Sequence, residues 1–193
     1  MKCKALSLSD IEKARQWRNE QPEILRTSFP LTAEMQEQFY RDVVCNRQAN
    51  ARFWGIWIPT QIEVYELYSE KRMVDIEVLI GMAGLENIQW ENRLAEISLI
   101  LNPDHADCMG EALRQLLHEG FNNLNMENIY TEVYEFSPYL DFWLSYNPDF
   151  TPCFIRLPNR KYYRGRYYDS FYINFNKERY NENTVSEPAQ KTD

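Results

Sequence analysis

The stretch from residue 94 to residue 134 carries three patterns in a row, and their order constrains the fold more than any other feature of the chain. Residues 94–101 (LAEISLIL) and 128–134 (NIYTEVY) have the branched and aromatic content of strands. Between them, apolar residues recur at helical spacing and predict a helix over about 111–123: Ala112, Leu113, Leu116, Leu117, Phe121 and Leu124. Because two strands joined by a crossover helix pair in parallel, we expect a parallel pair here.

Further segments have strand composition and complete the predicted sheet. They are residues 2–8, 51–58, 76–84, 150–157 and 167–175. The polar segment between the second and third of these is predicted to be an extended hairpin, and the basic segment between the last two a turn. Such connections favour antiparallel pairing. We therefore predict an α+β fold, with a mixed, mostly antiparallel twisted sheet and helices on both faces.

Helix-start signals place the remaining helices. Ser9 followed by Glu12 has the pattern of a capping box and predicts a helix through residue 17. Thr32 is predicted to cap a second helix. Ser137-Pro138 predicts a third that runs to about Tyr146, because proline is tolerated at the first helical position.

The length and net charge of the chain limit the number of domains and the kinds of molecule that it can bind. A chain of 193 residues is predicted to form one domain over 1–180, followed by a polar tail at 181–193 that we expect to be disordered. The net charge of −8 disfavours non-specific binding to nucleic acid. No apolar run is long enough for a signal peptide or a membrane span, so we expect a cytoplasmic protein without a membrane partner.

The cysteines and histidines give no recognisable metal motif. The four cysteines, at 3, 45, 108 and 153, are far apart and form no CxxC pair. The chain has two histidines, His105 and His118, which are predicted to lie in a loop and on a helix surface. We therefore expect reduced thiols and no metal.

Several short phrases, in their order, resemble the GNAT acetyltransferase superfamily, especially its Rim-type and nucleotide-sugar N-acetyltransferase branches. The resemblance spans about residues 4–176. The phrases are Trp17-Arg18-Asn19, Leu79-Ile80-Gly81, Asn92-Arg93, Ala95-Glu96-Ile97, Ile100-Leu101-Asn102-Pro103, Glu111-Ala112-Leu113 and Glu132-Val133, together with Phe121, Leu124, Asn125 and Ile129. It implies acetyl-CoA as co-substrate and a parallel strand pair that splays apart after the fourth strand.

The resemblance also assigns residues to the coenzyme. Backbone groups of Leu99, Ile100 and Leu101 would pair with the pantetheine arm, and the loop at Cys108, Met109, Gly110 and Glu111 would cradle the pyrophosphate at a helix N-terminus.

This loop departs from the family pattern. Only Gly110 matches a family glycine, the family's basic residue is replaced near Ala106, and Asp107 and Glu111 add negative charge. A working loop and a degenerate loop are both compatible with this sequence.

The resemblance implies a catalytic base and an acid for acetyl transfer. Glu96, with Ser98 on the same strand face, is the candidate base, although a paired structural glutamate is the alternative. Tyr146 and Tyr139 are the candidate acids for the leaving thiolate, although the Asn and Gly of the family phrase are missing around them. Packing tyrosines are the alternative for both.

A basic cluster lies in the predicted late turn. Its members are Arg156, Arg160, Lys161, Arg164 and Arg166. It could receive an acidic substrate or the coenzyme's 3′-phosphate, and a charge-rich hairpin in water is the alternative.

Two functions follow, and a third is weaker. The first is an N-acetyltransferase that moves an acetyl group from acetyl-CoA to a primary amine, which could be an amino sugar, a small amine or a protein N-terminus. The second is a GNAT-fold protein with a degenerate coenzyme loop that serves as a non-catalytic binding or assembly module. The third is an acyltransferase with another acyl donor. The expected partners are acetyl-CoA and a small-molecule or peptide amine, with a homodimer also compatible.

Overall fold

The computed structural model describes residues 1–24, 29–65, 71–145 and 153–184. These residues form a sheet with strand order β1-β2-β3-β4-β5-β7-β6. The strands are β1 (Lys2–Lys4), β2 (Arg52–Tyr65), β3 (Lys71–Gln89), β4 (Leu94–Leu101), β5 (Asn128–Tyr134), β6 (Cys153–Tyr163) and β7 (Arg166–Asn176). β4 and β5 are parallel, and the other described neighbours are antiparallel. The predicted mixed, mostly antiparallel sheet is confirmed.

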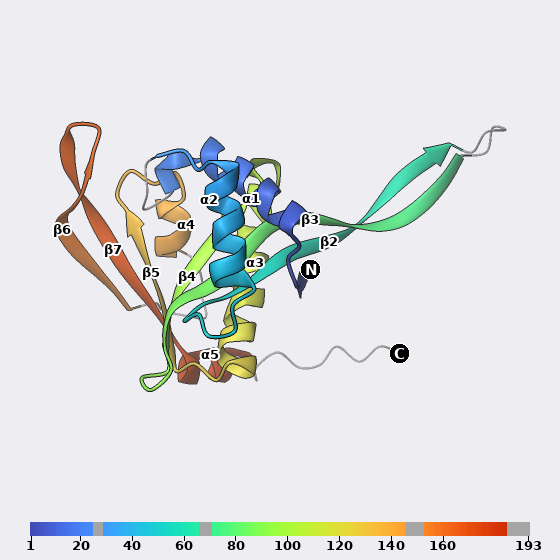
Figure 1. Ribbon diagram of the computed structural model, residues 1–193. Helices are drawn as coiled ribbons and strands as arrows, with labels where there is room; N and C mark the ends of the chain where they lie inside the picture. Colours follow the sequence, from blue (N-terminus) through green and yellow to red (C-terminus); the bar gives the residue numbers. More distant parts are fainter. Residues whose placement is uncertain (25–28, 66–70, 146–152, 185–193) are drawn as a thin grey trace.

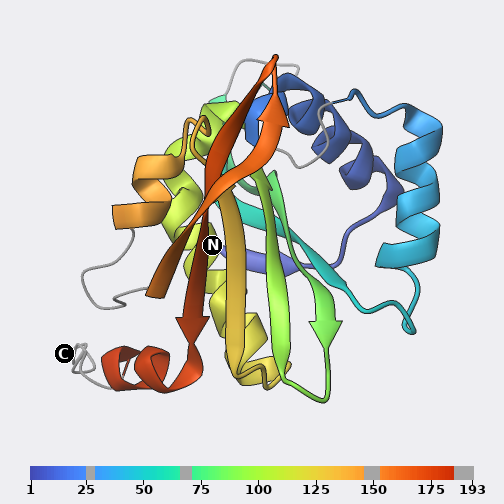
Figure 2. The same ribbon diagram turned by 90° about the vertical axis from the view of Figure 1, so that its left-hand side faces the viewer.

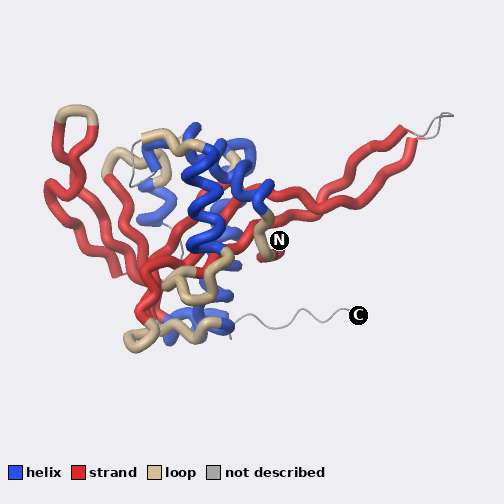
Figure 3. The backbone as a smooth tube through the Cα atoms, viewed as in Figure 1, coloured by secondary structure: helices blue, strands red, loops and turns tan. Residues whose placement is uncertain are grey.

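Helices cover both faces of this sheet (Figures 1 and 2). The α-helices are α1 (Leu8–Glu20), α2 (Ala33–Phe39), α3 (Met109–His118), α4 (Leu140–Ser145) and α5 (Lys177–Thr184). Short 3-10 segments are η1 (Pro22–Ile24) and η3 (Pro103–Cys108), and π-helical turns are η2 (Tyr40–Val44) and η4 (Glu119–Asn123). The tube view shows the helices grouped around the middle of the molecule, with strands extending to either side of them (Figure 3).

Alternation along β4 divides the core between the two faces. Ile97 and Leu101 pack with the buried stripe of α3, whereas Ile100 packs with Ile11 and Trp17 of α1. Five members of the stripe predicted from helical spacing are buried, and the sixth, Leu124, is half-buried: Ala112, Leu113, Leu116, Leu117 and Phe121 are the buried ones. The crossover unit is therefore folded as its sequence pattern predicted.

The cap of α1 lies two residues earlier than predicted. Ser7 is the N-cap, its Oγ accepts a hydrogen bond from the Asp10 N–H at 3.3 Å, and Asp10 accepts one from the Ser7 N–H at 2.9 Å. The Ser9–Glu12 prediction was wrong because Glu12 instead pairs with Arg15 along the helix surface. Thr32 caps α2 as predicted.

Three boundaries in the last third of the chain also differ from the prediction. α4 begins at Leu140 rather than at Ser137-Pro138. β6 and β7 continue through the basic segment, so that the turn itself is only Arg164-Gly165. α5 covers residues 181–184, for which we expected disorder, because Tyr180 is buried and packs on Phe121 with ring centroids 5.1 Å apart. Residues 185–193 lie outside the described part of the chain.

The outer halves of β2 and β3 form a two-stranded arm that projects from the body (Figure 1). This is the predicted extended hairpin. We define its aliphatic face by the paired positions Ile58 and Val78, Thr60 and Ile76, and Ile62 and Val74. Paired residues share a face, so the intervening residues, including Gln61 and Asp75, lie on the opposite side.

No described helix is long and apolar enough to cross a membrane.

The position of the α1 cap gives a first prediction. Ser7→Ala should lower the free energy of unfolding by about 1 kcal/mol, because the Asp10 backbone N–H loses the hydroxyl oxygen that accepts from it. Ser9→Ala is the matched control and should change it by less than about half as much. Urea denaturation of both variants measures the difference, and equal losses would contradict the Ser7 cap.

Candidate functional site

Strands β4 and β5 part soon after they meet, and a cavity lies where they separate. Their parallel pairing covers Leu94 with Asn128, Ala95 with Ile129 and Glu96 with Tyr130. Beyond these pairs, a cavity of about 150 Å³ lies between the strands. Its lining includes Ser98, Leu99 and Ile100 from β4, Thr131, Glu132 and Val133 from β5, and Arg18, Glu86, Glu96, Met109, Tyr139 and Trp143. Polar groups and charges from both halves of the chain therefore converge there.

Glu96 lines this cavity from the last paired position of β4 and β5. Only 2% of its surface is exposed. Its Oε2 accepts hydrogen bonds from Asn87 Nδ2 at 2.7 Å and from the Tyr130 hydroxyl at 3.2 Å. Asn87 lies at a bulge of β3 with a φ of 52°, which turns its side chain out of the strand register toward Glu96. The carboxylate is thus buried, oriented and directed at the space between the strands.

A second carboxylate stands directly opposite the first. Glu86 on β3 is the register partner of Glu96 on β4, so the two side chains share a face of the sheet. Like charges in this position repel, and Arg18 from α1 brings a compensating charge. Burial lowers the pKa of the Arg18 guanidinium, and the Glu86 carboxylate opposes that shift. The site therefore combines two carboxylates with one buried guanidinium.

Tyr139, the residue that immediately precedes α4, also lines this cavity. Its hydroxyl donates to Gln21 Oε1 at 3.2 Å, and Gln21 Nε2 donates to the Leu101 carbonyl at 2.8 Å. Gln21 therefore ties the phenol to the end of β4. Of the two candidate acids, Tyr139 lines the cavity, and Tyr146 lies outside the described residues.

The residues assigned to the coenzyme lie at the end of β4 and around the start of α3. Leu99, Ile100 and Met109 line the cavity, whereas Leu101 is buried. Cys108, Gly110 and Glu111 lie at the start of α3, outside that lining. Burial, followed by the Asp107 charge, raises the pKa of the Cys108 thiol.

The separation of β4 from β5 leaves room for an extended ligand arm, but the loop that follows β4 carries no lysine or arginine to offset a phosphate charge. Residues 102–111 contain no lysine or arginine. Glu111 accepts a hydrogen bond from Gln115 Nε2 at 3.1 Å and pairs with Arg114, which partly offsets its charge. Asp107 is exposed beside it. The Met109 N–H at the start of α3 donates to the Ala106 carbonyl, and the local charge also opposes an anion.

The basic hairpin is largely paired within the protein. Arg156 pairs with Asp169, Arg160 with Glu132 and Arg164 with Glu23. The remaining two cations lie over aromatic rings, Lys161 over Tyr134 and Arg166 over Tyr168. These contacts favour the charge-rich hairpin over a receptor for an acidic ligand.

Sequence reasoning missed several residues that build the site. Gln21, Asn87 and Tyr130 hold the candidate base and acid, and Glu86 supplies the second carboxylate. Only Glu86 carried a usable signal, since strand spacing relative to Glu96 could have placed it on the same face. The others depend on a bulge and on contacts between distant segments.

Comparisons with known proteins identify the family and the fold. The family model described as an acetyltransferase (GNAT) domain matches residues 4–136. No curated protein matches the sequence.

Among solved structures, three of spermidine N-acetyltransferase from Vibrio cholerae are similar. A point mutant is 19% identical, with a TM-score of 0.69 and coverage of 93% of this chain and 95% of that one. The complex with CoA and spermine is 18% identical, with a TM-score of 0.70 and coverages of 93% and 96%. A dodecameric form in an intermediate state is 20% identical, with a TM-score of 0.68 and coverages of 96% and 98%. At this identity the likeness shows the fold.

Proposed function

Because the chain belongs to the GNAT acetyltransferase family, we propose that it transfers an acetyl group from acetyl-CoA and that its acceptor is a small amine carrying positive charge. The observation that carries this proposal is the pair of carboxylates in the cavity lining, Glu86 and Glu96. Glu132 also lines the cavity, and its charge is offset by the ion pair with Arg160. A cationic amine would be attracted to such a site, whereas an acidic acceptor would be repelled.

The similar structures support this acceptor class. One of them holds CoA and spermine, a polyamine. An amino sugar phosphate or an acidic peptide would bring negative charge into a cavity that already holds these carboxylates. We therefore rank a small polyamine-like amine above the other acceptors that the sequence left open.

Glu96 and Tyr139 are the groups that we assign to proton transfer. An amine must lose a proton to attack a thioester, and the leaving thiolate must gain one. Glu96 is buried and oriented by two donors, which suits a base that accepts the amine's proton directly or through a water molecule. Tyr139 lies beside the end of β4 and can donate its hydroxyl proton to the sulfur.

We expect the co-substrate to bind between the end of β4 and the start of α3. Acetyl-CoA supplies the acetyl group as a thioester when it is bound. Leu99, Ile100 and Leu101 lie where β4 has left β5, so their backbone groups are the ones we expect to hold the pantetheine arm. Met109 and Gly110 lie at the N-terminal end of α3, which is the end that we expect nearest the pyrophosphate.

The base assignment predicts a specific loss in Glu96→Gln. The amide keeps the shape but accepts no proton, so kcat with spermidine should fall by about 10²–10⁴-fold while acetyl-CoA affinity stays within about twofold. Steady-state kinetics and calorimetry measure the two quantities. Unchanged kcat would remove Glu96 from the reaction. If wild-type protein binds no acetyl-CoA in calorimetry, the non-catalytic binding module replaces the enzyme as the function.

The acid assignment predicts a graded series. Tyr139→Phe should lower kcat by about 10²–10⁴-fold, because it removes only the proton donor. Gln21→Ala keeps the phenol but loses its anchor, and should lower kcat by about tenfold. Tyr146→Phe is the matched comparison, measured under the same saturating acetyl-CoA. A loss carried by Tyr146→Phe alone would move the acid onto the segment beyond α4.

We further propose that the chain self-associates through the aliphatic face of its arm. A two-stranded ribbon is only marginally stable alone, and this one exposes 41% of Ile62 and 37% of Val64. Its opposite face carries polar pairs such as Gln61 with Asp75 and Lys71 with Glu63, beside the exposed Met73. A second copy offers a complementary aliphatic face. The dodecameric form of a similar protein supports assembly as a property of this fold.

Light scattering during gel filtration tests this association. Ile62→Glu combined with Val74→Glu places two charges on the aliphatic face and should raise the dissociation constant by at least about 10²-fold. Gln61→Lys on the opposite face is the control, since lysine can pair with Asp75, and should leave the mass unchanged. A monomeric wild type, or equal effects of both changes, would contradict the proposal.

A further inference from the structure

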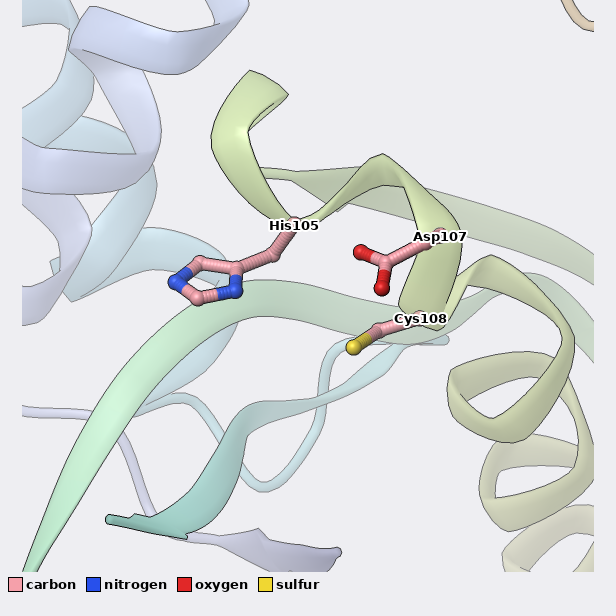
Figure 4. A group of neighbouring side chains, drawn as sticks. All are labelled: His105, Asp107 and Cys108. Atoms are coloured by element: carbon pink, nitrogen blue, oxygen red, sulfur yellow. The ribbon is translucent and has the colours of Figure 1, made fainter. Parts of the chain in front are cut away.

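Three side chains with different metal-ligating atoms converge in the turn between β4 and α3. A nitrogen of His105, a carboxylate oxygen of Asp107 and the Cys108 sulfur all lie within 4.8 Å of one another. Figure 4 shows the three side chains turned toward a common space beside the η3 backbone. We propose that this cluster binds a transition-metal ion of the Zn²⁺ class. The scattered cysteines and histidines gave no such prediction, because the sequence spacing matches no known zinc motif.

The ligand set decides which ion fits. Imidazole and thiolate are preferred by Zn²⁺ and its transition-metal neighbours, whereas Mg²⁺ and Ca²⁺ require mainly oxygen ligands. In a tetrahedral Zn²⁺ site, bonds of about 2.0–2.3 Å from the metal to its ligand atoms hold those atoms about 3.3–3.8 Å apart. Rotations of the three side chains can close the remaining distance. Three protein ligands leave a fourth position open to solvent or to an oxygen of a bound molecule.

The backbone of η3 explains why the three side chains meet. Asn102 begins the turn, with its side-chain oxygen accepting from the Asp104 N–H at 3.1 Å and its carbonyl from the His105 N–H at 2.9 Å. His105 leaves helical geometry, with φ −123° and ψ 27°, before the chain re-enters the helix. His105 and Cys108 are half-buried and Asp107 is exposed, so solvent ions can reach the cluster.

A bound cation would also change the charge at the start of α3. Asp107 and Glu111 make this end acidic, and residues 102–111 contain no lysine or arginine. A divalent ion would offset the Asp107 carboxylate and the Cys108 thiolate, and its open position could accept a phosphate oxygen. This second step rests on the proposed use of acetyl-CoA, whereas metal binding itself does not.

Calorimetric titration of untagged full-length protein with Zn²⁺, in the absence of acetyl-CoA, tests the metal site. We expect one equivalent of tight binding, and with Co²⁺ a thiolate-to-metal absorption band. Cys108→Ser and His105→Gln should each weaken binding by at least about tenfold and remove or shift that band. Cys45→Ser and His118→Gln are matched controls on exposed residues and should bind as the wild type does. No binding, or binding that survives both site variants, would overturn the site.

Acetyl-CoA titrations with and without Zn²⁺ test the second step. Wild-type protein should bind acetyl-CoA at least about tenfold more tightly with the metal present, and Cys108→Ser should lose this gain. Metal binding without any gain would overturn the phosphate role and leave the metal site standing. Absence of acetyl-CoA binding in both conditions would instead overturn the proposed enzyme function, again without touching the result of the metal titration.

Discussion

The backbone of β4 pairs with β5 from Leu94 to Glu96, and then the two strands diverge. Backbone N–H and C=O groups that leave a ladder inside a protein must find other partners or face a ligand. At the end of β4 one such carbonyl, that of Leu101, is satisfied by the side chain of Gln21. The cavity, the position of Tyr139 and the placement of α3 all follow from the angle at which these strands separate.

The charges around this fork are arranged at a structural cost. Glu86 and Glu96 face the same side on adjacent strands, where like charges oppose each other. Asn87 adopts a left-handed backbone conformation beside them and donates to Glu96. Arg18 is buried within reach of the Glu86 charge. A fold selected for stability alone would place apolar side chains here, so the arrangement is typical of a site that handles charge.

The sequence predicted the parts of the structure that depend on local periodicity. Strands 94–101 and 128–134 and the buried stripe of α3 have the predicted positions, since each pattern is continuous and strong. The α1 cap was missed because Ser7 and Ser9 both lie near the start of the helix and only the second is followed by glutamate at the usual spacing. α5 was missed because its sequence is polar, and the packing of Tyr180 on Phe121, which helps attach it to the core, joins segments far apart in the chain. In the site, Glu96 and Tyr139 were predicted from a family resemblance, whereas Gln21 and Asn87 depend on a bulge and on contacts between segments far apart in the chain.

Gln21 joins three elements at one side of the cavity. Its side chain donates to Trp17 in α1 and to Leu101 at the end of β4, and accepts from Tyr139 ahead of α4. The bond to Trp17 lies within the last turn of α1, so two of the three hydrogen bonds connect different elements. Each of these two is worth about 1 kcal/mol net. A change that removed the Gln21 amide would therefore loosen the end of β4 from α1, and α1 from the start of α4, at the same time.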